Sequence, residues 1–132
     1  MQAKRNVWIF IGLIYVFFVS AASAGSLSGV WTKTTHPDAY NVTLLIADDI
    51  NVKAIGYGMV SGKPAMWFGE GRVTGYNLTL AYRYGKDATP VGWEKEGTMQ
   101  LVISEDGKSM HGKATSLSGD WSGEVEFRRL KP

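Results

Sequence analysis

The stretch Leu27–Thr34, which reads Leu-Ser-Gly-Val-Trp-Thr-Lys-Thr, decides the fold of this chain. It reads as the first strand, and it carries Trp31, a large aromatic side chain on which a small β-fold can close. The last expected strand, Trp121–Leu130, is the natural partner for that closure, and it carries Arg128 and Arg129 near its end. From this stretch to the end of the chain, the sequence predicts strand after strand with short turns.

Apolar and polar residues alternate with a period of two, which indicates half-buried strands. Tyr40, Val42, Leu44 and Ile46 alternate with Asn41, Thr43, Leu45 and Ala47, and an Asp-Gly pair at 106–107 marks a tight hairpin. Eight strands at a spacing of about ten residues favour an all-β, eight-stranded antiparallel up-and-down barrel, because closure removes exposed sheet edges. A β-sandwich is the alternative, in which Gly85–Gly92 is the one connection that could cross over. The expected strands are 27–34, 40–47, 52–60, 65–73, 76–84, 93–104, 109–116 and 121–130.

The N-terminus has the layout of a secretory signal peptide. Lys4 and Arg5 precede an apolar run from Val7 to Val19, and Ala22-Ser23-Ala24 offers a cleavage site. The alternative is a retained membrane anchor, but the run is shorter than the roughly 20 residues that span a bilayer. We therefore expect residues 1–24 to be a cleaved signal peptide, residues 25–132 to be one β-barrel domain, and the protein to be periplasmic or secreted.

Composition narrows the function classes. The chain has 14 Lys and Arg against 12 Asp and Glu, and because two of the basic residues lie in the leader, the rest is balanced. Basic residues are interleaved with acidic ones, so the footprint of a nucleic-acid binder is missing. The chain has no cysteine, which excludes disulfides, thiolate metal sites and cysteine catalysis. Export without disulfides fits a bacterial envelope protein.

The first and the last predicted strand carry a family resemblance. Gly29-Val30-Trp31 on the first strand and Phe127-Arg128-Arg129-Leu130 on the last resemble the calycin superfamily, which includes lipocalins, fatty-acid-binding proteins, avidins and bacterial metalloprotease inhibitors. The resemblance implies that the tryptophan packs across one end of the barrel beneath a basic side chain. Arg129 is the first choice for that side chain because it shares the phase of Phe127, and Arg128 is the alternative. Leu-Ser-Gly-x-Trp-Thr is similar to the avidin opening, but Lys33 stands where avidins have an asparagine, so biotin binding is not carried over.

If the apolar phases face inward, the interior is rich in both large apolar residues and glycine. Interior glycine either permits sharp strand coiling or leaves room for a ligand. In the strand 52–60 the phase is ambiguous, since Ile55, Tyr57 and Met59 could face inward instead of the glycines between them. The expected lining is Trp31, Tyr40, Val42, Leu44, Ile46, Trp67, Leu78, Leu80, Tyr82, Met99, Leu101, Ile103, Met110, Trp121, Val125 and Phe127, with Gly56, Gly58, Gly69, Gly71, Gly97, Gly112 and Gly123 in the same phases.

Aromatic residues flank the two breaks expected at one barrel end, 61–64 and 85–92. The candidate ligand-binding residues are Tyr57, Trp67, Tyr82 and Trp93, with Tyr84 as a further candidate for the same end. An aromatic rim suits a small apolar or sugar-like ligand. The alternative is that these aromatics simply supply core area.

No catalytic or metal-binding constellation is visible. His36 and His111 are far apart in sequence, and Asp48-Asp49 lacks the further oxygen ligands that calcium needs. No ionisable residue falls firmly in an inward phase, so we expect no enzyme, no metal and no cofactor. An inward Glu70 with a raised pKa would point instead to a cofactorless barrel enzyme such as a cyclase or isomerase.

Two functions therefore remain open as the main expectations. The first is an exported barrel that binds a small, mainly apolar ligand. The second is an envelope protein-interaction or inhibitor module, motivated by the neutral, polar exterior and by the Ser/Thr-rich segment 32–39. The expected partners are accordingly a small apolar ligand or an envelope protein, without nucleic acid and without a membrane span after signal cleavage.

Overall fold

The computed structural model describes residues 27–35 and 41–131. The predicted signal peptide, the cleavage site, His36 and Tyr40 lie outside the described residues. Within them, all regular structure is β, in eight strands. They are β1 (Gly29–Lys33), β2 (Asn41–Asp48), β3 (Asn51–Val60), β4 (Lys63–Thr74), β5 (Asn77–Tyr84), β6 (Glu96–Ile103), β7 (Ser109–Ser116) and β8 (Ser122–Lys131).

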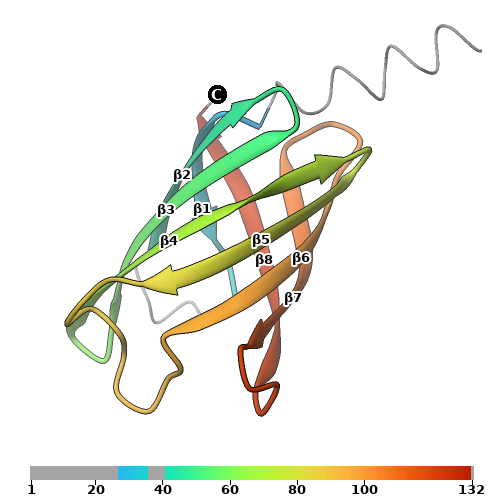
Figure 1. Cartoon of the computed structure of the whole chain (residues 1–132). Coiled ribbons are helices and arrows are strands. Elements are labelled where there is room, and N and C mark those ends of the chain that lie inside the picture. The colour runs from blue at the N-terminus through green and yellow to red at the C-terminus, as the bar shows by residue number, and fades with distance from the viewer. Residues whose placement is uncertain (1–26, 36–40, 132) are drawn as a thin grey trace, which may run out of the picture.

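The strands form one closed antiparallel barrel in the order β1 to β8, with β8 pairing back onto β1 (Figure 1). This confirms the predicted fold class, the up-and-down connectivity and the number of strands. The sandwich alternative is wrong, because each strand pairs with its two neighbours in sequence and the connection from Gly85 to Lys95 joins the adjacent strands β5 and β6. Closure through β1 and β8 leaves no free edge in the ladder.

The two ends of the barrel differ. The turns after β2, β4 and β6 lie at one end, together with the start of β1 and the end of β8; we call this the closed end (Figure 1). The turn after β3 and the longer connections after β5 and β7 lie at the opposite end, which we call the loop end.

Trp31 fills the closed end. Its side chain is fully buried, and its indole N–H donates a hydrogen bond to the Leu27 carbonyl oxygen at 3.0 Å. The Arg129 guanidinium carbon lies 4.7 Å from the indole centroid, a cation–π geometry. The same guanidinium donates to the carbonyl oxygens of Ser28 and Gly107, each at 3.2 Å. Arg129, and not Arg128, therefore covers the ring, and it ties the residue that precedes β1 to the turn between β6 and β7.

The inward phase is as predicted in most strands. Val52 and Ala54 are buried on β3, and the other buried apolar side chains join them in one continuous cluster. The glycine phase of β3 faces inward, while Ile55 and Tyr57 are exposed. The remaining members of the cluster are Leu27, Trp31, Leu45, Trp67, Val73, Leu78, Leu80, Tyr82, Met99, Leu101, Ile103, Met110, Ala114, Val125 and Phe127.

The predicted phase of β2 is wrong. Thr43 and Leu45 are buried, whereas Leu44 and Ile46 are 40% and 53% exposed. Both phases of this strand are apolar, so alternation alone could not select one. Thr43 pairs with Trp31 on β1, and directly opposite residues share a face of the sheet, so the small threonine sits beside the large indole.

The predicted inward position of Trp121 is also wrong in part. Trp121 lies just before β8 and is half exposed, with its ring placed over Gly123. It therefore belongs to the rim of the loop end and not to the buried core.

Candidate functional site

A row of four aromatic rings leads from the barrel interior to the surface at the loop end; we call Trp67, Tyr82, Tyr84 and Trp93 the aromatic row. Successive centroids are 6.3, 6.1 and 6.0 Å apart, and all three contacts are edge-to-face. Such pairs are each worth about 0.5–1.5 kcal/mol beyond burial. The exposed fraction rises from 6% at Trp67 to 48% at Trp93.

The row brings together three of the four residues predicted to bind a ligand. Trp67, Tyr82 and Trp93 belong to it, and Tyr84 links the last two. Tyr57 does not join them, because it lies in the outward phase of β3 and is 41% exposed. The sheet separates it from the inward rings.

Strand register explains how the row is built. Trp31 pairs with Thr43, Thr43 with Gly56, Gly56 with Trp67, and Trp67 with Tyr84. This line of paired residues crosses five strands on the inner face. It connects the tryptophan of the closed end to the aromatic row.

The inward glycines make room for rings in this row. A Cβ on Gly56 would overlap the Trp67 indole, and a Cβ on Gly97 would overlap the Tyr82 ring. At Gly71 and Gly112 a Cβ would instead overlap backbone of the neighbouring strand, which is the strand-coiling role expected of glycine in a small barrel. Space left by Gly56 and Gly97 is thus occupied by the protein's own side chains.

The rim around Trp93 is apolar and held by hydrogen bonds between the two long connections. Val91 and Leu117 are 88% and 69% exposed, and Trp121 is half exposed. The Glu94 carboxylate accepts hydrogen bonds from the backbone N–H and the hydroxyl of Ser118, at 3.2 and 2.7 Å. Hydrogen bonding by the Ser116 and Ser118 hydroxyls lowers the pKa of Glu94, so this link is made by a carboxylate at neutral pH.

One inward residue was missed by the sequence analysis. Lys33 pairs with Phe127, which is buried in the core, so the lysine stem is directed to the inside of the barrel. Burial lowers the pKa of Lys33. The expectation that no ionisable residue faces inward is therefore wrong. The signal was present in the sequence, because Lys33 lies two residues after Trp31 and shares its phase.

Burial at the loop end also changes the pKa values of two phenols, those of Tyr82 and Tyr84. Burial, and then the neighbouring Tyr82, raises the pKa of Tyr84 well above the usual tyrosine value. Burial, and then the charge of Glu94, also raises the pKa of Tyr82. Both phenols are therefore neutral at physiological pH and can donate a hydrogen bond.

A second apolar surface lies on the outside of the barrel. Six exposed side chains on β2, β3 and β4 form it: Leu44, Ile46, Ile55, Tyr57, Met66 and Phe68, which we call the apolar wall. Leu44 pairs with Ile55 and Ile55 with Phe68, so the wall is continuous across the three strands. Each member is between 36% and 53% exposed.

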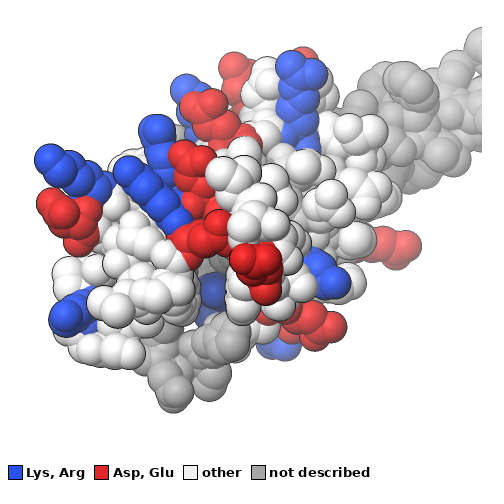
Figure 2. All heavy atoms as spheres, turned by 60° about the horizontal axis from the view of Figure 1, so that its bottom comes forward, with Lys and Arg blue, Asp and Glu red and all other residues white. Residues whose placement is uncertain are grey.

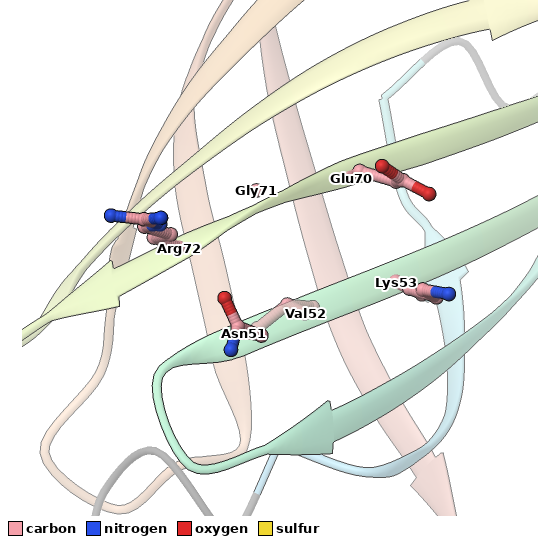
Figure 3. Close-up of a pocket in the computed structure, with 6 residues that line it drawn as sticks. All are labelled: Asn51, Val52, Lys53, Glu70, Gly71 and Arg72. Atoms are coloured by element: carbon pink, nitrogen blue, oxygen red, sulfur yellow. The ribbon is translucent and has the colours of Figure 1, made fainter.

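A shallow hollow of about 360 Å³ lies on β3 and β4 near the closed end (Figure 3). Its charged and polar lining residues stand on both strands, with Lys53 near Glu70 and Asn51 near Arg72 in register. Glu70 is exposed here and does not face the barrel interior, unlike the inward acid that a barrel enzyme would need.

Basic and acidic side chains occur together on one face of the molecule (Figure 2). On the face turned toward the viewer in Figure 2, basic and acidic side chains alternate around uncharged areas. His111, Asp48 and Asp49 are exposed, and no group of three potential metal ligands occurs in residues 27–35 and 41–131.

The chain matches no protein-family model, and the searches of curated proteins and of solved structures find no match. The resemblance to calycins accordingly stands on the barrel and on the residues of its closed end. In the part of the chain that the structure describes, no helix is long and apolar enough to cross a membrane.

Proposed function

We propose that the protein is an exported, calycin-like barrel that binds a small, mainly apolar ligand at its loop end and performs no catalysis. The observation that carries the proposal is the aromatic row, which exposes half of Trp93 while its inner members are buried. Because the Trp67 and Tyr82 rings fill the space beside Gly56 and Gly97, the ligand is expected at the loop end and not in a cavity beneath these rings.

The rim supplies the chemistry that a small apolar ligand needs. Trp93 and Trp121 offer half-exposed indole faces, and Leu117 and Val91 add apolar area. The neutral phenols of Tyr82 and Tyr84 and the linked Ser118 and Glu94 side chains provide a few polar groups that can orient a ligand. Export rests on the predicted signal peptide, and the calycin relationship on Trp31 beneath Arg129.

The test is a fluorescence titration with N-phenyl-1-naphthylamine, an uncharged probe that brightens in apolar sites. We expect saturable binding to the parent and at least a roughly fivefold weaker affinity in Trp93→Ser. Phe68→Ser is the matched control, since Phe68 is exposed to a similar extent (44%) but lies on the outer wall. Absence of saturable binding, or equal losses in both variants, would contradict the proposal.

The apolar wall favours a second candidate, an envelope protein-interaction or inhibitor module. With on the order of 200 Å² for each of its six large side chains, two aromatic and four aliphatic, and exposures of 36% to 53%, the wall presents on the order of 500 Å². A patch of this size is at the upper end for a monomer surface. With a polar rim it approaches the roughly 800 Å² per partner of a standard interface.

The partner expected there is a protein with a flat apolar surface. The edge of that surface should carry acidic residues that complement Lys53 and Arg83 in charge. Capture from an envelope extract should recover one partner with the parent and with Trp93→Ser, and lose it with Ile55→Ser/Phe68→Ser. Retention by the wall variant would exclude this function. Sedimentation of the purified protein identifies the case in which the partner is a second copy of the chain.

A further inference from the structure

Lys33 stands out because it is a cation directed into an otherwise apolar barrel. It is the last residue of β1, on the loop-end side of Trp31, and its paired residue Phe127 is part of the core. Its placement follows from the same alternation that buries Trp31, so the register that directs the indole inward also directs the lysine inward.

The strands that flank β1 offer this cation no countercharge. The inward residues described on β2 and β8 next to it are Thr43, Val125 and Phe127, none of them acidic. The charged residues of β8 nearby, Glu126 and Arg128, pair with each other at 3.3 Å on the outer surface. Among the described residues, no ion pair involves Lys33.

A second polar group at the same place also has unused hydrogen-bonding capacity. The Thr35 hydroxyl, two residues beyond Lys33, is buried and has no hydrogen-bond partner among the described residues. Buried hydroxyls and cations without partners are costly, and a site that keeps both is suited to a ligand that satisfies them.

Small residues also stand on the inner face toward the loop end. Gly58 and Ala65 pair with each other on β3 and β4 and are buried on the inner face, one step nearer the loop end than Gly56 and Trp67. An acid group entering from the rim would meet Lys33 and Thr35, while its apolar body stayed on the aromatic row.

We propose that Lys33, with the Thr35 hydroxyl, receives the acid group of a small amphipathic monoanion, a carboxylate or sulfonate, whose apolar part lies on the aromatic row. This inference rests on the proposed function, since it specifies the ligand of the same site. A charge-assisted hydrogen bond in apolar surroundings is strong because the medium screens it weakly.

The test compares two fluorescent probes with the same aromatic body. Anilinonaphthalene sulfonate is an anion, and N-phenyl-1-naphthylamine is its uncharged counterpart. We expect Lys33→Met to weaken binding of the anionic probe about tenfold, which corresponds to about 1.4 kcal/mol, and to leave the neutral probe within about twofold. Lys33→Arg should keep the preference for the anion, and Lys53→Met, an exposed lysine on β3, should behave as the parent.

The outcomes separate the two levels of the proposal. If the neutral probe binds and Lys33→Met leaves the affinity for the anion unchanged, the role of Lys33 is wrong and the apolar site stands. If neither probe binds to the parent in a saturable way, the proposed function itself is wrong. If Lys53→Met weakens binding of the anionic probe as much as Lys33→Met does, the lost affinity reflects the net charge of the protein, and the inference fails.

Discussion

Replacing Arg129 with Met tests the closed end of the barrel. The variant keeps an unbranched apolar stem over the indole but loses the cation–π contact at 4.7 Å, worth about 0.5–2 kcal/mol. It also loses the hydrogen bonds to the carbonyl oxygens of Ser28 and Gly107, each worth about 1 kcal/mol net. We expect Arg129→Met to lower the free energy of unfolding by about 2–4 kcal/mol, a large part of the roughly 5–15 kcal/mol typical of a domain.

Arg128→Met is the matched control, one residue away on the same strand. Its side chain is 68% exposed and makes an exposed ion pair with Glu126, which is worth about 0–1 kcal/mol. Urea unfolding followed by far-UV circular dichroism measures both variants, and with a slope of about 1–3 kcal/mol/M the Arg129 variant should unfold about 1 M or more earlier. Losses that agree within about 0.5 kcal/mol, or a loss below about 1 kcal/mol for Arg129→Met, would refute the closure argument. A double-mutant cycle that combines Arg129→Met with Trp31→Phe measures the coupling energy between the two side chains, and a value near zero would also refute the closure argument.

Three further predictions follow from the interior. Gly56→Ala should cost about 1–3 kcal/mol because its methyl group overlaps the Trp67 indole, while Gly85→Ala, whose nearest neighbours lie at 3.7 Å or more, should be near neutral in thermal unfolding. Folding raises the pKa of Tyr84, so above about pH 10 the unfolded chain loses the phenol proton first and the free energy of unfolding decreases. Urea midpoints measured at several pH values should decrease less steeply above about pH 10 in Tyr84→Phe than in the parent. Folding lowers the pKa of Lys33, so as the pH rises the native protein loses this proton before the unfolded chain does. The free energy of unfolding of the parent therefore increases as the pH approaches about 10.4. Lys33→Met should be more stable than the parent at pH 7, and this difference should shrink toward that pH. A stability difference between Lys33→Met and the parent that does not change with pH would contradict this reading of the lysine.

The fold could be predicted from the sequence because strand alternation and turn residues are local signals. The strand count, the up-and-down order and closure through β1 and β8 all follow from them, as the structure confirms. The phase of β2 could not, since Leu44 and Leu45 are equally apolar and only the packing of Thr43 beside Trp31 selects between the two faces.

The candidate site was predictable only in part. The aromatic residues near the two loop-end breaks were visible as a group, but alternation places Tyr57 on the opposite face of the sheet once the phase of β3 is known. Lys33 was overlooked because charged residues are expected outside, although its spacing from Trp31 placed it inside. The apolar wall depends on which phase of β2 faces outward, so it could not be seen before the register was known.

Chemical-shift mapping of the indole N–H groups of Trp31, Trp67, Trp93 and Trp121 tests the central claim most directly. These tryptophans report separately on the closed end, the inner row and the rim. Titrating the ¹⁵N-labelled protein with N-phenyl-1-naphthylamine should shift the indole signals of Trp93 and Trp121 most, that of Trp67 less, and leave Trp31 unchanged. A saturating probe that leaves the Trp93 and Trp121 signals in place while backbone amides of Ile55 and Phe68 shift would contradict binding at the loop end and move the ligand site to the outer wall.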